Sequence, residues 1–171
     1  MIKEFKPALL FVAKFLVIYF VGNVIYGVYV ESFNNVADPM TNWVTIQSAQ
    51  ILNLFVAGVE SYSDPMLPKV HLLLNNRTVI SVYEGCNGLN VIIIFVAFLA
   101  AYGGRLKRLS WFVPLGIVII HLFNLARIAL LYYVAEYHHT FMYFTHKYLF
   151  TATIYVVVLA LWYWWATKLS K

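Results

Sequence analysis

Three side chains of different chemistry could form one nucleophilic site in this sequence. Cys86 is the only cysteine, and it lies between Gly85 and Gly88 at the start of an apolar run. Arg127 lies in a second apolar run that is otherwise almost uncharged, and His146 stands just before the last one. A thiol, a histidine and a fixed cation supply a nucleophile, a proton shuttle and an oxyanion stabiliser, which are the parts that acyl transfer requires.

Each of these residues also has a simpler interpretation. A lone free cysteine is often a small buried apolar residue without reactivity. An arginine inside a membrane usually lines a polar cavity, but near a helix end it can also extend to the interface. The choice depends on whether Cys86, Arg127 and His146 meet in space.

Composition places the chain in a membrane. Of its 171 residues 63% are hydrophobic and 11% charged, and the mean hydropathy is +0.77, which excludes an ordinary soluble domain. The net charge of +5 does not predict a nucleic-acid partner, because the basic residues are separated along the chain. One cysteine excludes an intrachain disulfide and a multi-cysteine zinc site, and we expect neither a metal nor a cofactor.

Apolar runs predict an all-α integral membrane protein with one membrane domain, 1–171, and about four transmembrane helices. The spans are 9–30, 87–102, 111–131 and 148–166. Three of them are long enough, or nearly so, to cross a hydrocarbon core of about 30 Å, and 87–102 is shorter but strongly apolar. Most basic residues then share one side, which the positive-inside rule makes cytoplasmic: Lys3, Lys6, Arg105, Lys107, Arg108, Lys168 and Lys171. Both termini are therefore expected inside, and Cys86, Arg127 and His146 at the outer face.

The segment 31–86 is the expected extracytoplasmic loop. Its first half, 43–58, predicts a helix that lies on the membrane surface, since Gln47 and Gln50 interrupt the apolar pattern of a span. Its second half predicts a β-hairpin of strands 70–74 and 77–83, because Asn75-Asn76 tolerates the positive φ of a tight turn.

Four further residues are candidates for support of the site or for substrate binding. Asn124 lies one helical turn before Arg127, where it could orient the guanidinium or bond across helices. Glu84, Asn87 and Gly88 flank the thiol, although Glu84 could equally be a solvated loop charge.

Other histidines compete with His146. His138 and His139 lie in the same predicted outer loop and could substitute for it, but only Glu136 stands near them as a further metal ligand. His121 lies about 9 Å deeper than Arg127 and is expected to be a buried, hydrogen-bonded histidine.

The three candidate residues also lie in motifs with a family resemblance. Residues 84–90, Glu-Gly-Cys-Asn-Gly-Leu-Asn, resemble the exosortase and archaeosortase cysteine motif. Residues 124–128, Asn-Leu-Ala-Arg-Ile, are similar to that family's Asn-x-x-Arg-Ile signature. Residues 146–150 resemble its third motif, which begins with a histidine. The resemblance covers roughly residues 49–166, and the chain length is similar to the short exosortase-family form of Bacteroidetes-type bacteria.

This resemblance implies a membrane cysteine protease-transpeptidase of the bacterial inner membrane, with its active site facing the periplasm. It would recognise the C-terminal transmembrane sorting tail of exported proteins, cleave it, and transfer the product to an envelope acceptor. Cys86 would form the thioester, His146 would move protons, and Arg127 would stabilise the oxyanion.

Two functions of other classes remain. One is a non-catalytic membrane scaffold or assembly factor in envelope export, in which Arg127 only anchors helix packing. The other is a small transporter or proton relay along Arg127, His121 and Asn124, although no inverted repeat is visible. The sequence leaves the oligomeric state open.

Overall fold

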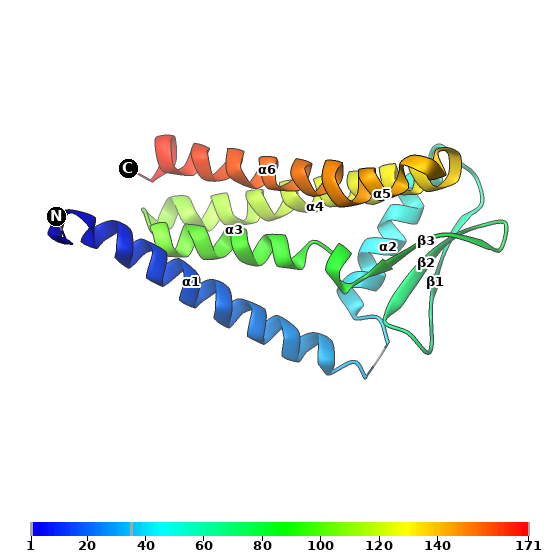
Figure 1. Cartoon of the computed structure of the whole chain (residues 1–171), viewed down its shortest axis with the longest axis horizontal. Helices are drawn as coiled ribbons and strands as arrows, with labels where there is room; N and C mark the ends of the chain where they lie inside the picture. Colours follow the sequence, from blue (N-terminus) through cyan, green and yellow to red (C-terminus); the bar gives the residue numbers. More distant parts are fainter. Residues whose placement is uncertain (1, 35, 171) are drawn as a thin grey trace.

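A computed structural model describes residues 2–34 and 36–170, with the side chains of residues 2–4, 139, 149 and 150 excepted. The molecule has two parts along its longest axis: a set of long helices, and a small end made of one helix and a sheet (Figure 1). Both chain termini lie at the helical end, away from the sheet. The chain crosses from one part to the other at Cys86, between β3 and α3.

Within the described residues, three helical segments are long and apolar enough to cross a membrane: Phe5–Glu31, Leu106–Tyr137 and Met142–Leu169. They belong to α1 (Ile2–Glu31), to α4 (Leu106–Tyr137), and to a continuous series formed by α5 (Met142–Phe144), the π-helix η3 (Thr145–Leu149), α6 (Phe150–Trp164) and the π-helix η4 (Trp165–Leu169). The fourth predicted span is α3 (Leu89–Tyr102), which is apolar but has only 14 residues. At about 1.5 Å per residue, α3 is about 21 Å long.

The predicted helix boundaries need correction at two places. The third span was expected at 111–131, but α4 continues to Tyr137 because Tyr132, Tyr133 and Val134 extend its apolar pattern. The last span was expected from residue 148, but the helical segment already begins at Met142. His146 therefore lies inside a helical turn and not in the loop before it.

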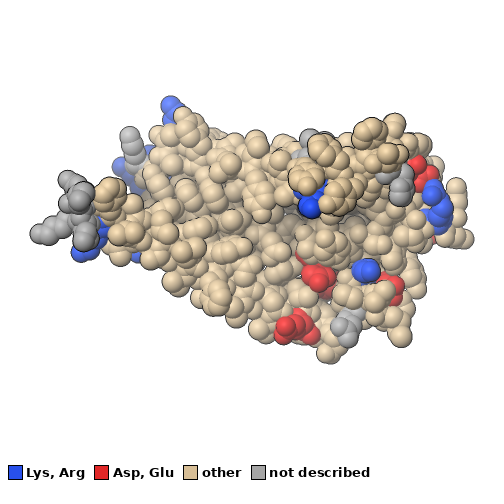
Figure 2. All heavy atoms as spheres, viewed as in Figure 1, with Lys and Arg blue, Asp and Glu red and all other residues tan. Residues whose placement is uncertain are grey.

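Charged residues divide between the two ends of the molecule. In the face drawn in Figure 2, the aspartate and glutamate side chains all lie in the half toward the sheet, whereas lysine and arginine side chains lie both at the end that holds the termini and among the acidic ones near the sheet. Large apolar side chains cover the helices between these ends and are exposed along α1, as Leu9, Val17 and Phe20 are. An apolar band between two charged ends is the surface that a lipid bilayer solvates.

The predicted hairpin is confirmed and belongs to a larger sheet. Strands β2 (Lys69–Leu74) and β3 (Arg77–Tyr83) pair antiparallel, and Asn75 and Asn76 have φ values of 51° and 62°. Both are the positive values that a two-residue hairpin turn requires. The sequence did not predict β1 (Val59–Ser63), which pairs with β2 and makes the strand order β1-β2-β3.

The predicted loop helix is shorter than expected and packs against protein. Helix α2 (Pro39–Leu52) begins after Asp38, whose side chain accepts hydrogen bonds from the Met40 and Thr41 N–H groups, at 2.9 and 3.1 Å. Its buried face joins a core with the sheet and α4, and Trp43 and Ile46 lie exposed on the other face. Residues 53–58 are turns, because Asn53 ends the helix by binding the backbone of Gly58 and Val59.

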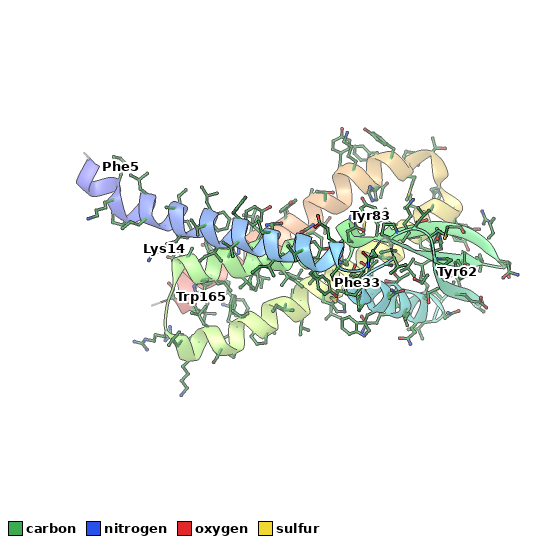
Figure 3. All side chains as sticks on the ribbon, turned by 90° about the horizontal axis from the view of Figure 1, so that it is seen from below. Phe5, Lys14, Phe33, Tyr62, Tyr83 and Trp165 are labelled. Atoms are coloured by element: carbon green, nitrogen blue, oxygen red, sulfur yellow. The ribbon has the colours of Figure 1, made fainter. Side chains whose placement is uncertain are left out.

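Two cores hold the molecule together. One lies at the sheet end and includes Leu72, Val82, Cys86 and Ile128. The other lies among α3, α4 and α6 and includes Phe95, Phe112, Val158 and Trp165. The labelled Trp165 in Figure 3 marks the end of the second core nearest the termini, and Tyr83 marks the junction of the sheet with the helices. Cys86 thus belongs to the sheet-end core, and α3, which begins three residues later, contributes to the other core.

Candidate active site

A strand, a tight turn and a helix position Cys86. β3 ends at Tyr83, the 3₁₀ turn η1 (Glu84–Cys86) follows, and α3 begins at Leu89. Gly88 makes the turn possible with φ of 87°, and a Cβ at this residue would lie 3.3 Å from the Asn124 side chain. Only glycine adopts such a backbone at low cost while leaving room for that neighbour.

Helix α4 directs two side chains at Cys86. The Asn124 amide Nδ2 donates a 3.0 Å hydrogen bond to the Cys86 carbonyl, and the Arg127 guanidinium approaches the Cys86 thiol, with 3.9 Å between nitrogen and Sγ. The two residues are three apart in sequence, so they share one face of α4. The Arg127 Nε is buried and has no hydrogen-bond partner among the described residues. Arg127 thus keeps a polar atom without a partner next to the thiol, although it is not among the residues that line the adjoining cavity.

Arg127 is deeper than the sequence predicted. It was expected about 6 Å from the end of its helix, but α4 continues for ten residues beyond it, to Tyr137, which is about 15 Å. Along the axis of α4 the guanidinium nevertheless lies beside the Cys86 thiol. This is possible because α3 is short and Cys86 stands just before its first residue. The two helices thus bring a cation and a thiol together about three turns before the Tyr137 end of α4.

His146 shares a cavity with Cys86. This cavity, the Cys86 cavity, has a volume of about 230 Å³ and is lined by Thr78–Val82 of β3, by Cys86, by Ile128 and Leu131 of α4, and by Met142 and His146. Arg127 is close enough to His146 for their charges to interact. No hydrogen bond joins the described side chains of Cys86 and His146, and both of them line the cavity.

The π-helical turn η3 (Thr145–Leu149) presents His146. A π-turn places one extra residue in a helical turn and rotates the side chains that follow relative to an α-helix, and such turns are frequent at functional sites. No pattern in the sequence predicted this turn.

Tyr83 is a site residue that the sequence analysis missed. Its ring lies over Gly85, where a Cβ would be 2.6 Å from the ring. The charge of Cys86, then burial, then a hydrogen bond to Cys86 raise the pKa of Tyr83 above its ordinary value. The phenol therefore keeps its proton beyond the pH at which a free tyrosine loses it. The signal in the sequence was a tyrosine three residues before the cysteine.

Asn87 holds the turn in place and does not face the thiol. Its side chain is buried, donates to Tyr26 Oη at 3.0 Å and to Thr41 Oγ1 at 3.2 Å, and accepts from the Leu89 N–H at 2.9 Å. These bonds connect α1, α2 and the start of α3. The Tyr26 hydroxyl also donates to the Glu84 carbonyl, at 2.9 Å, so Glu84 contributes its backbone to the same network.

The remaining histidines of α4 and its end lie elsewhere. His121 hydrogen-bonds Gln47 at 2.8 Å and stacks on Trp43, which fits the expected packing role. His138 ends α4 and is exposed beside Tyr133, and the side chain of His139 lies outside the described residues. In the part of the chain that the structure describes, no three histidine, cysteine or acidic side chains are grouped as metal ligands.

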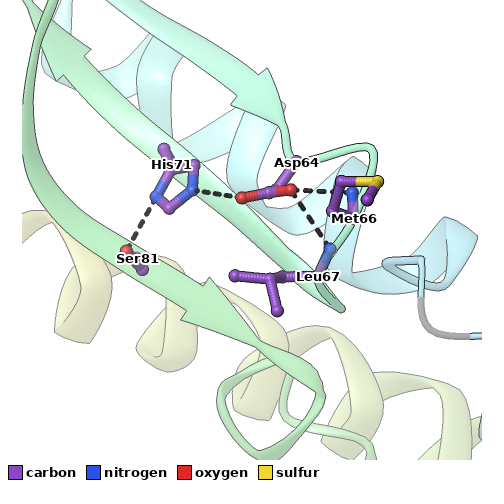
Figure 4. Close-up of polar contacts among 5 residues, drawn as sticks. All are labelled: Asp64, Met66, Leu67, His71 and Ser81. Atoms are coloured by element: carbon purple, nitrogen blue, oxygen red, sulfur yellow. Dashed lines mark hydrogen bonds and ion pairs between the residues drawn. The ribbon is translucent and has the colours of Figure 1, made fainter.

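A second polar cluster lies on the sheet (Figure 4). Ser81 Oγ is 2.8 Å from His71 Nδ1, and His71 Nε2 is 3.3 Å from Asp64 Oδ2. The residue types are those of a serine hydrolase triad. Asp64 also accepts the backbone N–H groups of Met66 and Leu67, which lower its pKa together with His71. The cluster ties the β1–β2 turn to β3 and is a structural brace.

The fold and the site together define a multi-pass membrane protein with a cysteine on a strand-turn-helix junction. The family model described as transmembrane exosortase matches residues 5–165 of the chain. The chain therefore belongs to the transmembrane exosortase family. No curated protein and no solved structure matches it.

Proposed function

We propose that the chain is a cysteine transpeptidase that cleaves the C-terminal sorting tail of exported proteins and transfers the new C-terminus to an envelope acceptor. The observation that carries this proposal is the 3.9 Å approach of the Arg127 guanidinium to the Cys86 thiol, beside a cavity that His146 also lines. The family's known activity supports the reaction class.

The first half of the reaction forms a thioester. Cys86 gives its proton to the His146 imidazole, and Sγ attacks the scissile carbonyl carbon. The carbonyl oxygen becomes an oxyanion bonded to the carbon that Sγ attacks, within reach of the Arg127 guanidinium, which donates hydrogen bonds to it. The C–N bond then breaks, and the imidazolium gives its proton to the leaving amine.

The second half of the reaction regenerates the thiol. The nucleophile of the acceptor enters where the tail has left and attacks the thioester carbonyl, while His146 takes its proton. The C–S bond breaks, and the proton returns from His146 to the Cys86 thiolate. The side chains present supply each of these steps, so the mechanism requires no cofactor.

The proposed membrane arrangement has four spans, α1, α3, α4 and the series from α5 to η4, with both termini in the cytoplasm. Basic residues near both termini and in the α3–α4 turn support it. The sheet and α2 then lie in the periplasm, and Cys86 lies at the outer end of the shortest span. A substrate anchored by a single C-terminal helix reaches this thiol by lateral diffusion in the bilayer.

Thiol chemistry tests the function. A peptide-based electrophile in membranes of the host bacterium should label Cys86, labelling should be lost in Cys86→Ala, and it should fall strongly in His146→Ala. Tailed envelope proteins should accumulate uncleaved in both variants. His138→Ala is the matched control and should behave as the unmodified chain. Normal tail processing in Cys86→Ala cells would instead support a non-catalytic scaffold.

A further inference from the structure

β3 is an edge strand that faces the candidate nucleophile. The sheet order is β1-β2-β3, so among the described strands β3 pairs on one side only, with β2. In Figure 1 β3 is the strand of the sheet nearest α5. Met142 of α5 and residues of β3 line the same Cys86 cavity. The unpaired edge of β3 therefore faces the cavity.

The lining of the cavity indicates contact with the backbone of β3. Five consecutive residues, Thr78 to Val82, line it. The register with β2 shifts at Val79, but Ile80, Ser81 and Val82 pair regularly. Successive side chains of such a regular stretch point to opposite faces of a sheet, so a single face would supply only every second residue. A wall made of consecutive residues is the strand edge, where backbone N–H and C=O groups are exposed.

The two ends of this edge are defined. At one end β3 leads directly into the turn that carries Cys86. At the other end Arg77 forms an ion pair of 2.6 Å with Glu136 at the end of α4, which joins the start of β3 to that helix. The edge between them spans five residues, or about 16 Å at roughly 3.3 Å per residue. This length fits a short extended peptide whose end reaches the thiol.

We propose that the polypeptide around the scissile bond binds in an extended conformation along the free edge of β3, from Thr78 to Val82, and becomes a fourth strand of the sheet. The inference rests on the proposed function and specifies how its substrate is recognised. Backbone hydrogen bonds to β3 give binding that is tolerant of sequence, and alternate side chains of the peptide meet the walls of the cavity.

The chemistry of the cavity favours a peptide over a lipid chain. Its helical wall is apolar at Ile128, Leu131 and Met142. Its other wall is β3, whose backbone groups on the edge away from β2 have no partner strand among the described residues. Such groups are costly where water is excluded, and a hydrocarbon chain cannot pair with them. An extended peptide pairs with them and covers the apolar wall with its side chains.

Disulfide trapping tests the geometry, because the Cys86→Ala chain has no cysteine. Into this background we would introduce Thr78→Cys, whose side chain is exposed beside the cavity. The partner is a tailed envelope protein that accumulates uncleaved in Cys86→Ala cells, with single cysteines at five successive positions before its scissile bond. Ser81→Cys is the second variant, in case Thr78→Cys does not fold. Ser63→Cys, on the opposite edge strand β1, is the matched control.

The expected result is a period of two. Cross-linking to β3 should be strong at alternate substrate positions and weak between them, and Ser63→Cys should give none. Equal yields at successive positions, or no cross-link to either β3 variant from a bound substrate, would overturn the proposal. The second outcome would leave a lipid or a helical tail as the occupant.

A proline scan of the same five substrate positions, with the unmodified chain, separates this proposal from the proposed function. Proline removes a backbone N–H, so every second position should slow processing by at least about threefold. If processing is equally fast with proline at every position, the substrate does not bind as a fourth strand of the sheet. The proposed transpeptidase function would not be affected by that result. An absence of any uncleaved tailed protein in Cys86→Ala cells would instead refute the function itself.

Discussion

Asn124 and Cys86 are joined through the backbone: the Asn124 side-chain amide donates a 3.0 Å hydrogen bond to the Cys86 carbonyl. Asn124 is fully buried, and one helical turn later Arg127 approaches the thiol of the same residue. One bond fixes where the nucleophile stands, and the other contact places a charge beside it. The separation of these two roles suggests variants that affect position without removing a reacting group.

Asn124→Leu should impair positioning while preserving volume. The Cys86 carbonyl would lose its donor, which costs about 1–3 kcal/mol of the free energy of unfolding when a buried acceptor is left unpaired. A misplaced nucleophile should lower the rate of tail processing by between about tenfold and a hundredfold. Thermal unfolding in detergent and the processing rate measure the two effects. An unchanged rate would mean that the turn holds Cys86 without this bond.

Gly88→Ala should disturb the same turn from the other side. Gly88 has φ of 87°, and an added Cβ would lie 3.3 Å from the Asn124 side chain. We expect a loss of about 1–2 kcal/mol in the free energy of unfolding, together with slower labelling of Cys86. Gly27→Ala in α1 is the matched control, because nothing lies within 4 Å of its added Cβ. Equal unfolding temperatures of the two variants would contradict the prediction.

Local sequence signals predicted some of the fold and missed other parts for physical reasons. The Asn75-Asn76 pair marked the hairpin because a turn with positive φ is a local requirement. β1 was missed because Glu60, Ser61 and Ser63 give it little apolar alternation. Pairing with β2 creates this strand, and the Asn53 side chain fixes its start by donating to the Val59 carbonyl at 2.6 Å.

The candidate site shows the same division. Cys86, Arg127 and His146 could be selected from residue type and position relative to apolar runs, and the structure places them around one site. The contact of Tyr83 with the thiol was not predictable, since it depends on how its ring lies over Gly85. The π-turn that presents His146 also has no local sequence pattern.

Tyr83→Phe should slow the labelling of Cys86 by about threefold to tenfold, the effect of one lost hydrogen bond. The ring would still cover Gly85, so stability should hardly change. Because the pKa of Tyr83 is raised above its ordinary value of 10.0, the phenol keeps its proton at every pH well below 10.0. The ratio of labelling rates between the two chains should therefore stay constant from about pH 6 to 9. A ratio that changes within this range would mean that Tyr83 loses its proton there.

Asp64 should make the sheet sensitive to acid. The pKa of Asp64 is lowered below its ordinary value of 3.8, and the largest cause is the hydrogen bond from the Met66 N–H. A carboxylate with a lowered pKa stabilises the fold above that ordinary value, and this stabilisation is lost as the pH falls through the lowered pKa. In Asp64→Asn the unfolding temperature should therefore drop less than in the unmodified chain when the pH falls from 5 to 3. These two pH values lie about one unit above and below the ordinary pKa of an aspartate. An equal drop in both chains would assign the acid sensitivity to other groups.

Arg127→Lys distinguishes an oxyanion stabiliser from a helix anchor. The planar guanidinium offers several directed donors, and one ammonium cannot place two of them at the same positions. If Arg127 stabilises the oxyanion, the variant should fold and insert normally but process tails about 10²- to 10³-fold more slowly. If it only anchors α4, lysine extends to the interface in the same way and the rate survives. Arg77→Lys is the matched control, because Arg77 is exposed and pairs with the Glu136 carboxylate and not with Cys86, and a lysine can keep that ion pair. A nearly normal rate for Arg127→Lys, with Cys86→Ala and His146→Ala both inactive, would reduce the mechanism to two residues.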